Sequence, residues 1–191
     1  MSNMPNWDLT DLYQSVNDSK IIKDLEAIKN KSIELSEKYK GKLENISEEE
    51  FYNSIVLYEE IEQIVNLLGS YSYLNLSTQY DSSEALSFYQ NTSETINDYL
   101  KPTIFYTLEI NKLSDDKIAK LKANKNVQKY KKWLETVLVY KPYMLSEEVE
   151  ELLSDKNIPA NDAWIRLYDE VSAKLEYEVD GKNIMMQKFQ N

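Results

Sequence analysis

The chain of 191 residues contains no histidine and no cysteine, and these two absences exclude hydrolytic chemistry that depends on imidazole or thiolate groups. A hydrolytic zinc ion needs neutral imidazole or thiolate ligands, and carboxylates alone seldom provide a tetrahedral site. A serine nucleophile would have to use lysine as its base, and no local motif supports that arrangement. The lack of cysteine also excludes disulfides and iron–sulfur clusters, and it fits a reducing cytosol. We therefore predict no catalytic residue, no metal ligand and no cofactor in this chain.

Glycine and proline are scarce, with 3 and 4 residues, whereas 29% of the residues are charged and 42% are hydrophobic. Three glycines cannot build the phosphate-binding loops of nucleotide enzymes. The composition favours long helices around a real core, so we predict an all-α protein. Runs of carboxylates, such as those at 59–62 and 147–151, are interpreted as solvated helix faces and cap charges.

Acidic residues outnumber basic residues by 33 to 22, which gives a net charge of −11. An acidic surface repels phosphate backbones, so we expect no nucleic acid partner. The densest basic stretch, residues 117–132, is interpreted as a solvated helix face. No apolar run approaches the ~20 residues of a membrane span, and the first residues show no secretion signal. The expected location is therefore the cytoplasm, with no membrane partner.

Two helices are predicted from their capping residues and apolar periodicity. Asp18 or Ser19 can cap the first helix, and Gly41 follows it at a position where a positive φ is least costly without a Cβ. Ser47 opens the second helix with Glu50 three residues later, which is a capping box. The apolar stripe of this helix runs to about residue 76, over about 30 residues.

A third helix is predicted after residue 81, with a kink or a break at Pro102. Short connections between such helices favour antiparallel neighbours, so residues 1–113 are predicted to form a long three-helix bundle. Residues 114–191 are predicted to form a smaller helical subdomain that ends in a β-hairpin. The Asp180-Gly181 pair predicts the hairpin turn, because a type I′ turn needs positive φ at both central residues.

Two stretches of the sequence carry a family resemblance. Residues 7–13 read Trp-Asp-Leu-Thr-Asp-Leu-Tyr, and residues 141–153 read Lys-Pro-Tyr-Met-Leu-Ser-Glu-Glu-Val-Glu-Glu-Leu-Leu. The second stretch is followed by Ala163-Trp164 and by Leu175 ahead of Asp180-Gly181. These motifs resemble the N-terminal portion of the oligoendopeptidase F group of M3 metallopeptidases. The resemblance runs from residue 7 to about residue 182.

The resemblance implies a helical enzyme whose deep channel admits short unfolded peptides. Its catalytic helix carries His-Glu-x-x-His, in which two imidazoles bind zinc and the glutamate activates the bound water. This chain has no such helix, so we expect a noncatalytic N-terminal segment of a cytoplasmic zinc oligoendopeptidase that shapes the substrate channel. The expected partners are the missing C-terminal catalytic domain of the same polypeptide and, in the full-length enzyme, short peptides.

The 15 tyrosines raise the question of ligand binding. Five of them near predicted helix ends could offer hydroxyls to a peptide backbone: Tyr71, Tyr73, Tyr80, Tyr140 and Tyr143. Aromatic rings also suit helix packing with the phenol at the rim, and this structural interpretation is favoured. The tryptophans Trp7, Trp133 and Trp164 are likewise interpreted as packing anchors, and Trp7 is expected to pin the N-terminal segment to the fold. No residue is assigned to substrate binding.

A second hypothesis is a stand-alone helical module that binds a partner protein through an apolar groove. This hypothesis is favoured by the amphipathic helices and by the predicted hairpin, because a two-stranded hairpin is marginally stable unless it packs on another element. Under both hypotheses we expect a contiguous apolar patch on the second half of the chain. An in-frame continuation of the coding DNA with His-Glu-x-x-His would favour the first hypothesis, and a native stop after Asn191 would favour the second.

Overall fold

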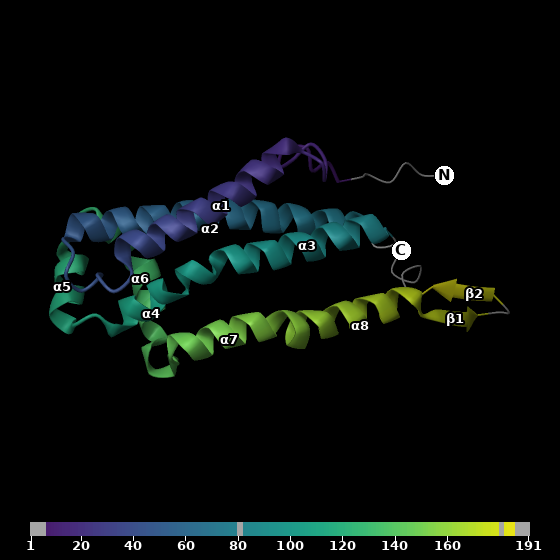
Figure 1. Ribbon diagram of the computed structural model, residues 1–191. Coiled ribbons are helices and arrows are strands. Elements are labelled where there is room, and N and C mark those ends of the chain that lie inside the picture. The colour runs from purple at the N-terminus through teal and green to yellow at the C-terminus, as the bar shows by residue number, and fades with distance from the viewer. Residues whose placement is uncertain (1–6, 80–81, 180–181, 186–191) are drawn as a thin grey trace. The chain divides into compact units, whose positions relative to one another are not determined.

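The computed structural model describes residues 7–79, 82–179 and 182–185 (Figure 1). Most of the described residues are helical, which confirms the all-α class. The long helices are α1 (Ser19–Tyr39), α2 (Glu48–Thr78) and α3 (Ser83–Leu100). The shorter helices are η1 (Lys101–Thr103), α4 (Ile104–Lys112), α5 (Asp115–Ala123), η2 (Val127–Tyr130), α6 (Lys131–Val139), η3 (Lys141–Tyr143), α7 (Glu147–Asn157), the π-helical turn η4 (Ile158–Asp162) and α8 (Ala163–Lys174).

The predicted caps define the ends of the first two helices. Asp18 caps α1, because its Oδ1 accepts a hydrogen bond of 2.9 Å from the backbone N–H of Lys20. Ser47 caps α2, because its Oγ accepts a bond of 3.1 Å from the N–H of Glu50. Gly41 follows α1 with a φ of +76°, which confirms the left-handed conformation predicted there. Each side-chain oxygen pairs an N–H that the helix itself leaves without a partner.

The third helical stretch is interrupted at Pro102, as predicted. Helix α3 ends at Leu100, a single 3-10 turn carries Pro102, and α4 continues to Lys112. Proline lacks the N–H that an α-helix would use there, and its ring clashes with the preceding turn. Helix α4, which follows the interruption, packs against α6.

Helices α1, α2 and α3 pack against one another as a three-helix bundle. Its core is formed by apolar side chains that recur at helical spacing on the facing sides. Those with no exposed surface include Ile28, Leu35, Phe51, Ile61 and Leu68. Fully burying one such side chain is worth about 1.5–3 kcal/mol, so these few positions supply much of the stability.

An aromatic cluster around Tyr106 joins the bundle to the shorter helices. The Tyr106 hydroxyl shares a 2.7 Å hydrogen bond with Ser54, and Ser54 donates to the carbonyl of Phe51 at 2.7 Å. The ring centroid of Tyr106 lies 5.0 Å from that of Tyr58 and 6.3 Å from that of Trp133. Trp133 therefore packs between elements, in line with the structural interpretation of this tryptophan.

The N-terminal segment is held by Tyr13 rather than by Trp7. Tyr13 is buried, donates its hydroxyl to Asp24 at 2.7 Å and packs on Tyr71 with 5.0 Å between ring centroids. The expectation for Trp7 was wrong, because 72% of its surface is exposed. A side chain with so little buried area contributes little to holding a segment in place.

The basic stretch at residues 117–132 does not form one solvated helix face, contrary to the interpretation from the sequence. Lys117 is buried; its Nζ donates to the carbonyl of Ile46 and lies 3.7 Å from Glu48. Lys131 and Lys132 both pair with Glu135. The partial neutralisation of these lysines leaves less positive charge at the surface than the sequence suggests.

The chain divides into two compact units, Met1–Glu151 and Leu152–Asn191. This division differs from the boundary predicted after residue 113. The reason is that Leu121, Val127 and Leu134 of the following helices are buried in the same core as the bundle. Hydrogen bonds also link the bundle to the helices that follow residue 113. Glu44 accepts bonds from the N–H and the hydroxyl of Ser114 at 3.0 Å and 2.6 Å.

Two short strands, β1 (Glu176–Val179) and β2 (Lys182–Met185), pair antiparallel, with Glu176 opposite Met185. The Asp180-Gly181 turn lies outside the described residues, so the complete hairpin stays a prediction. None of the helices in the described part of the chain is long and apolar enough to cross a membrane.

The two glycines Gly41 and Gly69 provide a matched test of the backbone. A Cβ at either position would meet no atom within 4 Å, so only the backbone conformation distinguishes them. Gly41→Ala is expected to destabilise the protein by about 1–2 kcal/mol, because L-residues are disfavoured at positive φ. Gly69→Ala lies inside α2 and is expected to stabilise it by about 0.5–1 kcal/mol. Urea unfolding of both variants measures the two changes in unfolding free energy. Changes of the same sign would contradict the backbone conformations assigned to the two glycines.

Candidate functional site

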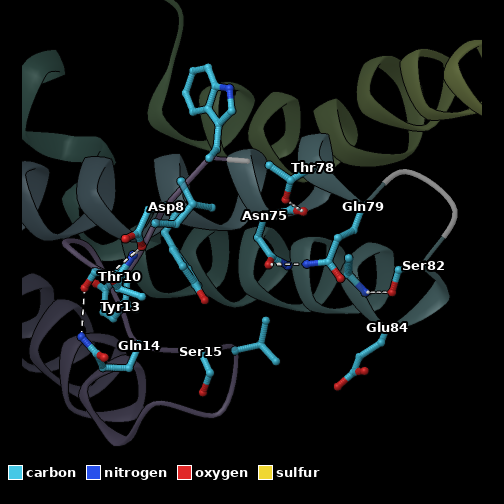
Figure 2. A pocket seen from close by; sticks show the side chains of 15 residues that line it. Asp8, Thr10, Tyr13, Gln14, Ser15, Asn75, Thr78, Gln79, Ser82 and Glu84 are labelled. Carbon is cyan, nitrogen blue, oxygen red and sulfur yellow. Dashed lines mark hydrogen bonds between the residues drawn. The ribbon is translucent and has the colours of Figure 1, made fainter. Parts of the chain in front are cut away.

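A cavity of about 380 Å³ lies between the N-terminal segment, the end of α2 and the start of α3 (Figure 2). The segment contributes Trp7, Asp8, Leu9, Thr10, Tyr13, Gln14, Ser15 and Val16, and the helices contribute Tyr71, Asn75, Thr78, Gln79, Ser82, Glu84 and Ala85. Its volume is within the range of small-ligand sites. All of these residues belong to the first compact unit.

Aromatic rings make the inner wall of this cavity. Tyr71 packs between Tyr13 and Phe88, with ring centroids 5.0 Å and 5.9 Å away. Burial raises the pKa of Tyr71, and burial together with Asp24 raises the pKa of Tyr13. Both phenols therefore stay protonated at neutral pH and act as hydrogen-bond donors rather than as bases.

Polar groups line the remaining walls, and one of them lacks a partner. Asn75 is buried, its Oδ1 accepts a bond of 3.1 Å from Gln79, and its Nδ2 has no hydrogen-bond partner (Figure 2). On the other side, Asp8 accepts bonds from the N–H and the hydroxyl of Thr10 at 3.0 Å and 2.6 Å. These bonds lower the pKa of Asp8, so this carboxylate is charged. An unpaired amide donor on one wall and a carboxylate on another suit binding of a small polar group.

The cavity does not combine the groups that catalysis needs. No histidine or cysteine exists in the chain to act as a base, a nucleophile or a zinc ligand. Within residues 7–79, 82–179 and 182–185, no group of three or more acidic residues is placed to hold a metal ion. The arrangement suits binding of a small ligand.

The tyrosines singled out in the sequence do not gather at one site. Tyr71 lines the cavity, whereas Tyr73 is exposed and contacts Tyr89, with 6.3 Å between ring centroids. Tyr140 and Tyr143, at the end of α6 and in η3, are exposed, and Tyr80 lies outside the described residues. The sequence interpretation missed Asn75. Its place four residues after Tyr71 on the buried stripe was the available signal.

Helix α8 exposes its apolar stripe. Trp164, Leu167, Tyr168 and Val171 recur at the spacing of one helix face. All four are exposed, Trp164 by 67% and Tyr168 by 70%. The interpretation of Trp164 as a packing anchor stays a prediction. From residue 152 on, no residue with a described environment is buried.

Helix α7 repeats this feature. Val149, Leu152 and Leu153 lie on one face of the helix and are exposed. Apolar residues are thus exposed on α7 and on α8, each taken by itself, and the contiguous apolar patch expected for the second half of the chain stays a prediction.

The comparisons with known proteins bear on this part of the chain. A family model for the N-terminal region of peptidase family M3, described as oligopeptidase F, matches residues 109–177. The chain resembles the N-terminal portion of an M3-family oligopeptidase F. The match contains the 141–153 stretch and Ala163-Trp164, so the recognition made from these motifs is confirmed, while the 7–13 motif lies outside it. No curated protein and no solved structure matches the chain.

In acid, the oligopeptidase F-like chain is expected to lose the stabilisation of the folded state that Asp18 contributes. The N–H groups of Lys20 and Gln14 donate to this carboxylate, each at 2.9 Å, and lower its pKa. A lowered folded-state pKa adds stability above the unfolded value of about 4 and loses it as the pH falls through the folded value. The free-energy difference between wild type and Asp18→Asn should therefore be largest near neutral pH and shrink below about pH 4.

Urea unfolding at a series of pH values measures this difference. Asp18→Ser is the matched control, because serine also caps a helix but does not titrate in this range. Both variants should show the same reduced acid sensitivity. A variant that kept the acid sensitivity of the wild type would show that Asp18 is not the group responsible.

Proposed function

We propose that this chain is the noncatalytic N-terminal segment of a zinc oligoendopeptidase, and that it acts by packing against the catalytic part of that enzyme. The observation that carries the proposal is the match of residues 109–177 to the oligopeptidase F model. In this role the segment forms part of the wall of the channel that admits short peptides. Zinc and the hydrolytic step belong to the catalytic part, and the cytoplasm is the proposed location.

The exposed helices support the packing role. The matched residues include both α7 and α8, whose apolar faces are uncovered in this chain. Each large apolar side chain gains about 1.5–3 kcal/mol when it is fully buried. A catalytic part that covered Trp164, Leu167 and Val171 would therefore bind with a large apolar contribution.

A second candidate is a stand-alone module that uses the same faces to bind another protein. The exposure of α8 favours this candidate as much as the first. The two differ in what the gene encodes after Asn191. An in-frame His-Glu-x-x-His supports the peptidase segment, and a stop codon supports the module.

The purified chain is expected to have no peptidase activity of its own. A quenched fluorescent peptide incubated with the chain and added zinc should stay intact, and metal analysis should find no stoichiometric zinc after dialysis. The physical reason is the absence of imidazole and thiolate ligands. EDTA-sensitive cleavage that co-elutes with the chain through two different columns would refute the noncatalytic assignment.

The apolar stripe of α8 is expected to bind a hydrophobic dye without supporting the fold of the first unit. Leu167→Glu should lower the fluorescence of bound anilinonaphthalene sulfonate and change the unfolding free energy by less than about 0.5 kcal/mol. Ile22→Glu is the control, since Ile22 is an exposed apolar residue of α1 outside this stripe. An equal loss of dye fluorescence in both variants would show that the apolar stripe of α8 binds the dye no better than other exposed apolar residues do.

A further inference from the structure

A second cavity, of about 330 Å³, lies among α2, η2 and α6. It is lined by Ile55, Tyr58, Glu59, Glu62, Tyr130 and Trp133. Its walls thus combine three aromatic rings with two carboxylates above a buried isoleucine. All six residues belong to the first compact unit.

The aromatic walls are fixed by packing beneath them. The ring centroids of Tyr58 and Trp133 are 6.0 Å apart, and both rings rest on the buried ring of Tyr106, at 5.0 Å and 6.3 Å. Tyr130 is held from the other side by Tyr52, with 6.1 Å between centroids. Rings that are already held in place lose little freedom when a ligand enters.

The carboxylates are oriented by the same aromatic residues. Glu59 accepts a 2.6 Å hydrogen bond from the hydroxyl of Tyr130, and this bond raises the pKa of Tyr130 to about 12. Glu62 lies one turn further along α2 and interacts with the hydroxyl of Tyr58. Among the ion pairs of the described residues, neither carboxylate is matched with a lysine or an arginine. Within the described part of the chain, these two carboxylates beside aromatic faces thus have no ion-pair partner.

We propose that this pocket binds the arginine side chain of a peptide. A cation over an aromatic face is attracted by the negative charge on that face, most strongly at tryptophan. The guanidinium is flat, weakly hydrated and able to stack on a ring while its N–H groups donate to a carboxylate. Arginine therefore fits rings and carboxylates together better than the compact, strongly hydrated lysine ammonium does.

The fold already uses the same interaction beside the pocket. The ammonium of Lys129 lies 5.8 Å from the ring centroid of Tyr52, the neighbour of Tyr130. This contact places a cation on an aromatic ring that neighbours the pocket. The proposal needs only α2, η2 and α6, and it stands whether or not the chain belongs to a peptidase.

The binding test uses Trp133 as the reporter. Trp7→Phe and Trp164→Phe, introduced together, leave Trp133 as the one tryptophan, and both replaced residues are largely exposed. N-acetyl-arginine amide is titrated into this protein while the fluorescence of Trp133 is recorded. N-acetyl-citrulline amide, which has the same shape without the charge, is the matched ligand control. N-acetyl-lysine amide tests the preference for guanidinium.

A saturable change with the arginine compound, weaker with the lysine compound and absent with the citrulline compound, is the expected result. Glu59→Gln and Glu62→Gln should each weaken binding by about three- to tenfold. Glu26→Gln removes an equal charge from the exposed surface of α1 and should leave the affinity unchanged. Thermal unfolding of each variant establishes that the fold is kept.

Three outcomes would overturn the proposal. Equal responses to the arginine and citrulline compounds would show that charge is not recognised. Tighter binding of the lysine compound would assign the pocket to ammonium groups. An equal weakening by Glu26→Gln and Glu62→Gln would reduce the effect to the overall charge of the protein.

Discussion

The burial of Tyr106 among Ser54, Tyr58 and Trp133 is the contact on which the rest of the first unit depends. Helices α4 and α6 have nine residues each, and isolated helices of that length are marginal in water. They persist because their aromatic side chains pack on α2, where Ser54 also satisfies the hydroxyl of Tyr106 at 2.7 Å. The same contact fixes Tyr58 and Trp133 at the surface, so the aromatic pocket is a consequence of how the core is closed.

The two units use the same sequence pattern with opposite results. In α1 and α2, apolar residues at helical spacing are buried, as in Ile28 and Leu68. In α8, Trp164 and Val171 follow the same spacing and are exposed. A periodic apolar pattern predicts that one helix face will be buried. It does not identify the element that buries this face. The oligopeptidase F match covers residues 109–177, which include all of α8.

Local features were predictable from the sequence because their causes are local. The caps at Asp18 and Ser47, the positive φ of Gly41 and the break at Pro102 each depend on the chemistry of a few neighbouring residues. Contacts between distant residues were not predictable in this way. Nothing near Trp7 signals that Tyr13 holds the segment in its place, and nothing near Glu59 signals that Tyr130, 71 residues later, donates to it. The cavity at Asn75 was missed for the same reason, since it is formed by three separate stretches of chain.

Charge acts over long and over short distances in this protein, and the two have different effects on binding. A net charge of −11 attracts cationic peptides from a distance, but this attraction is screened beyond about 8 Å at physiological salt and does not distinguish arginine from lysine. Discrimination needs contact, where ring faces and a carboxylate select the flat guanidinium over the rounder ammonium. The long-range field therefore raises the rate of encounter, while the pocket of Tyr58, Tyr130 and Trp133 determines what stays bound.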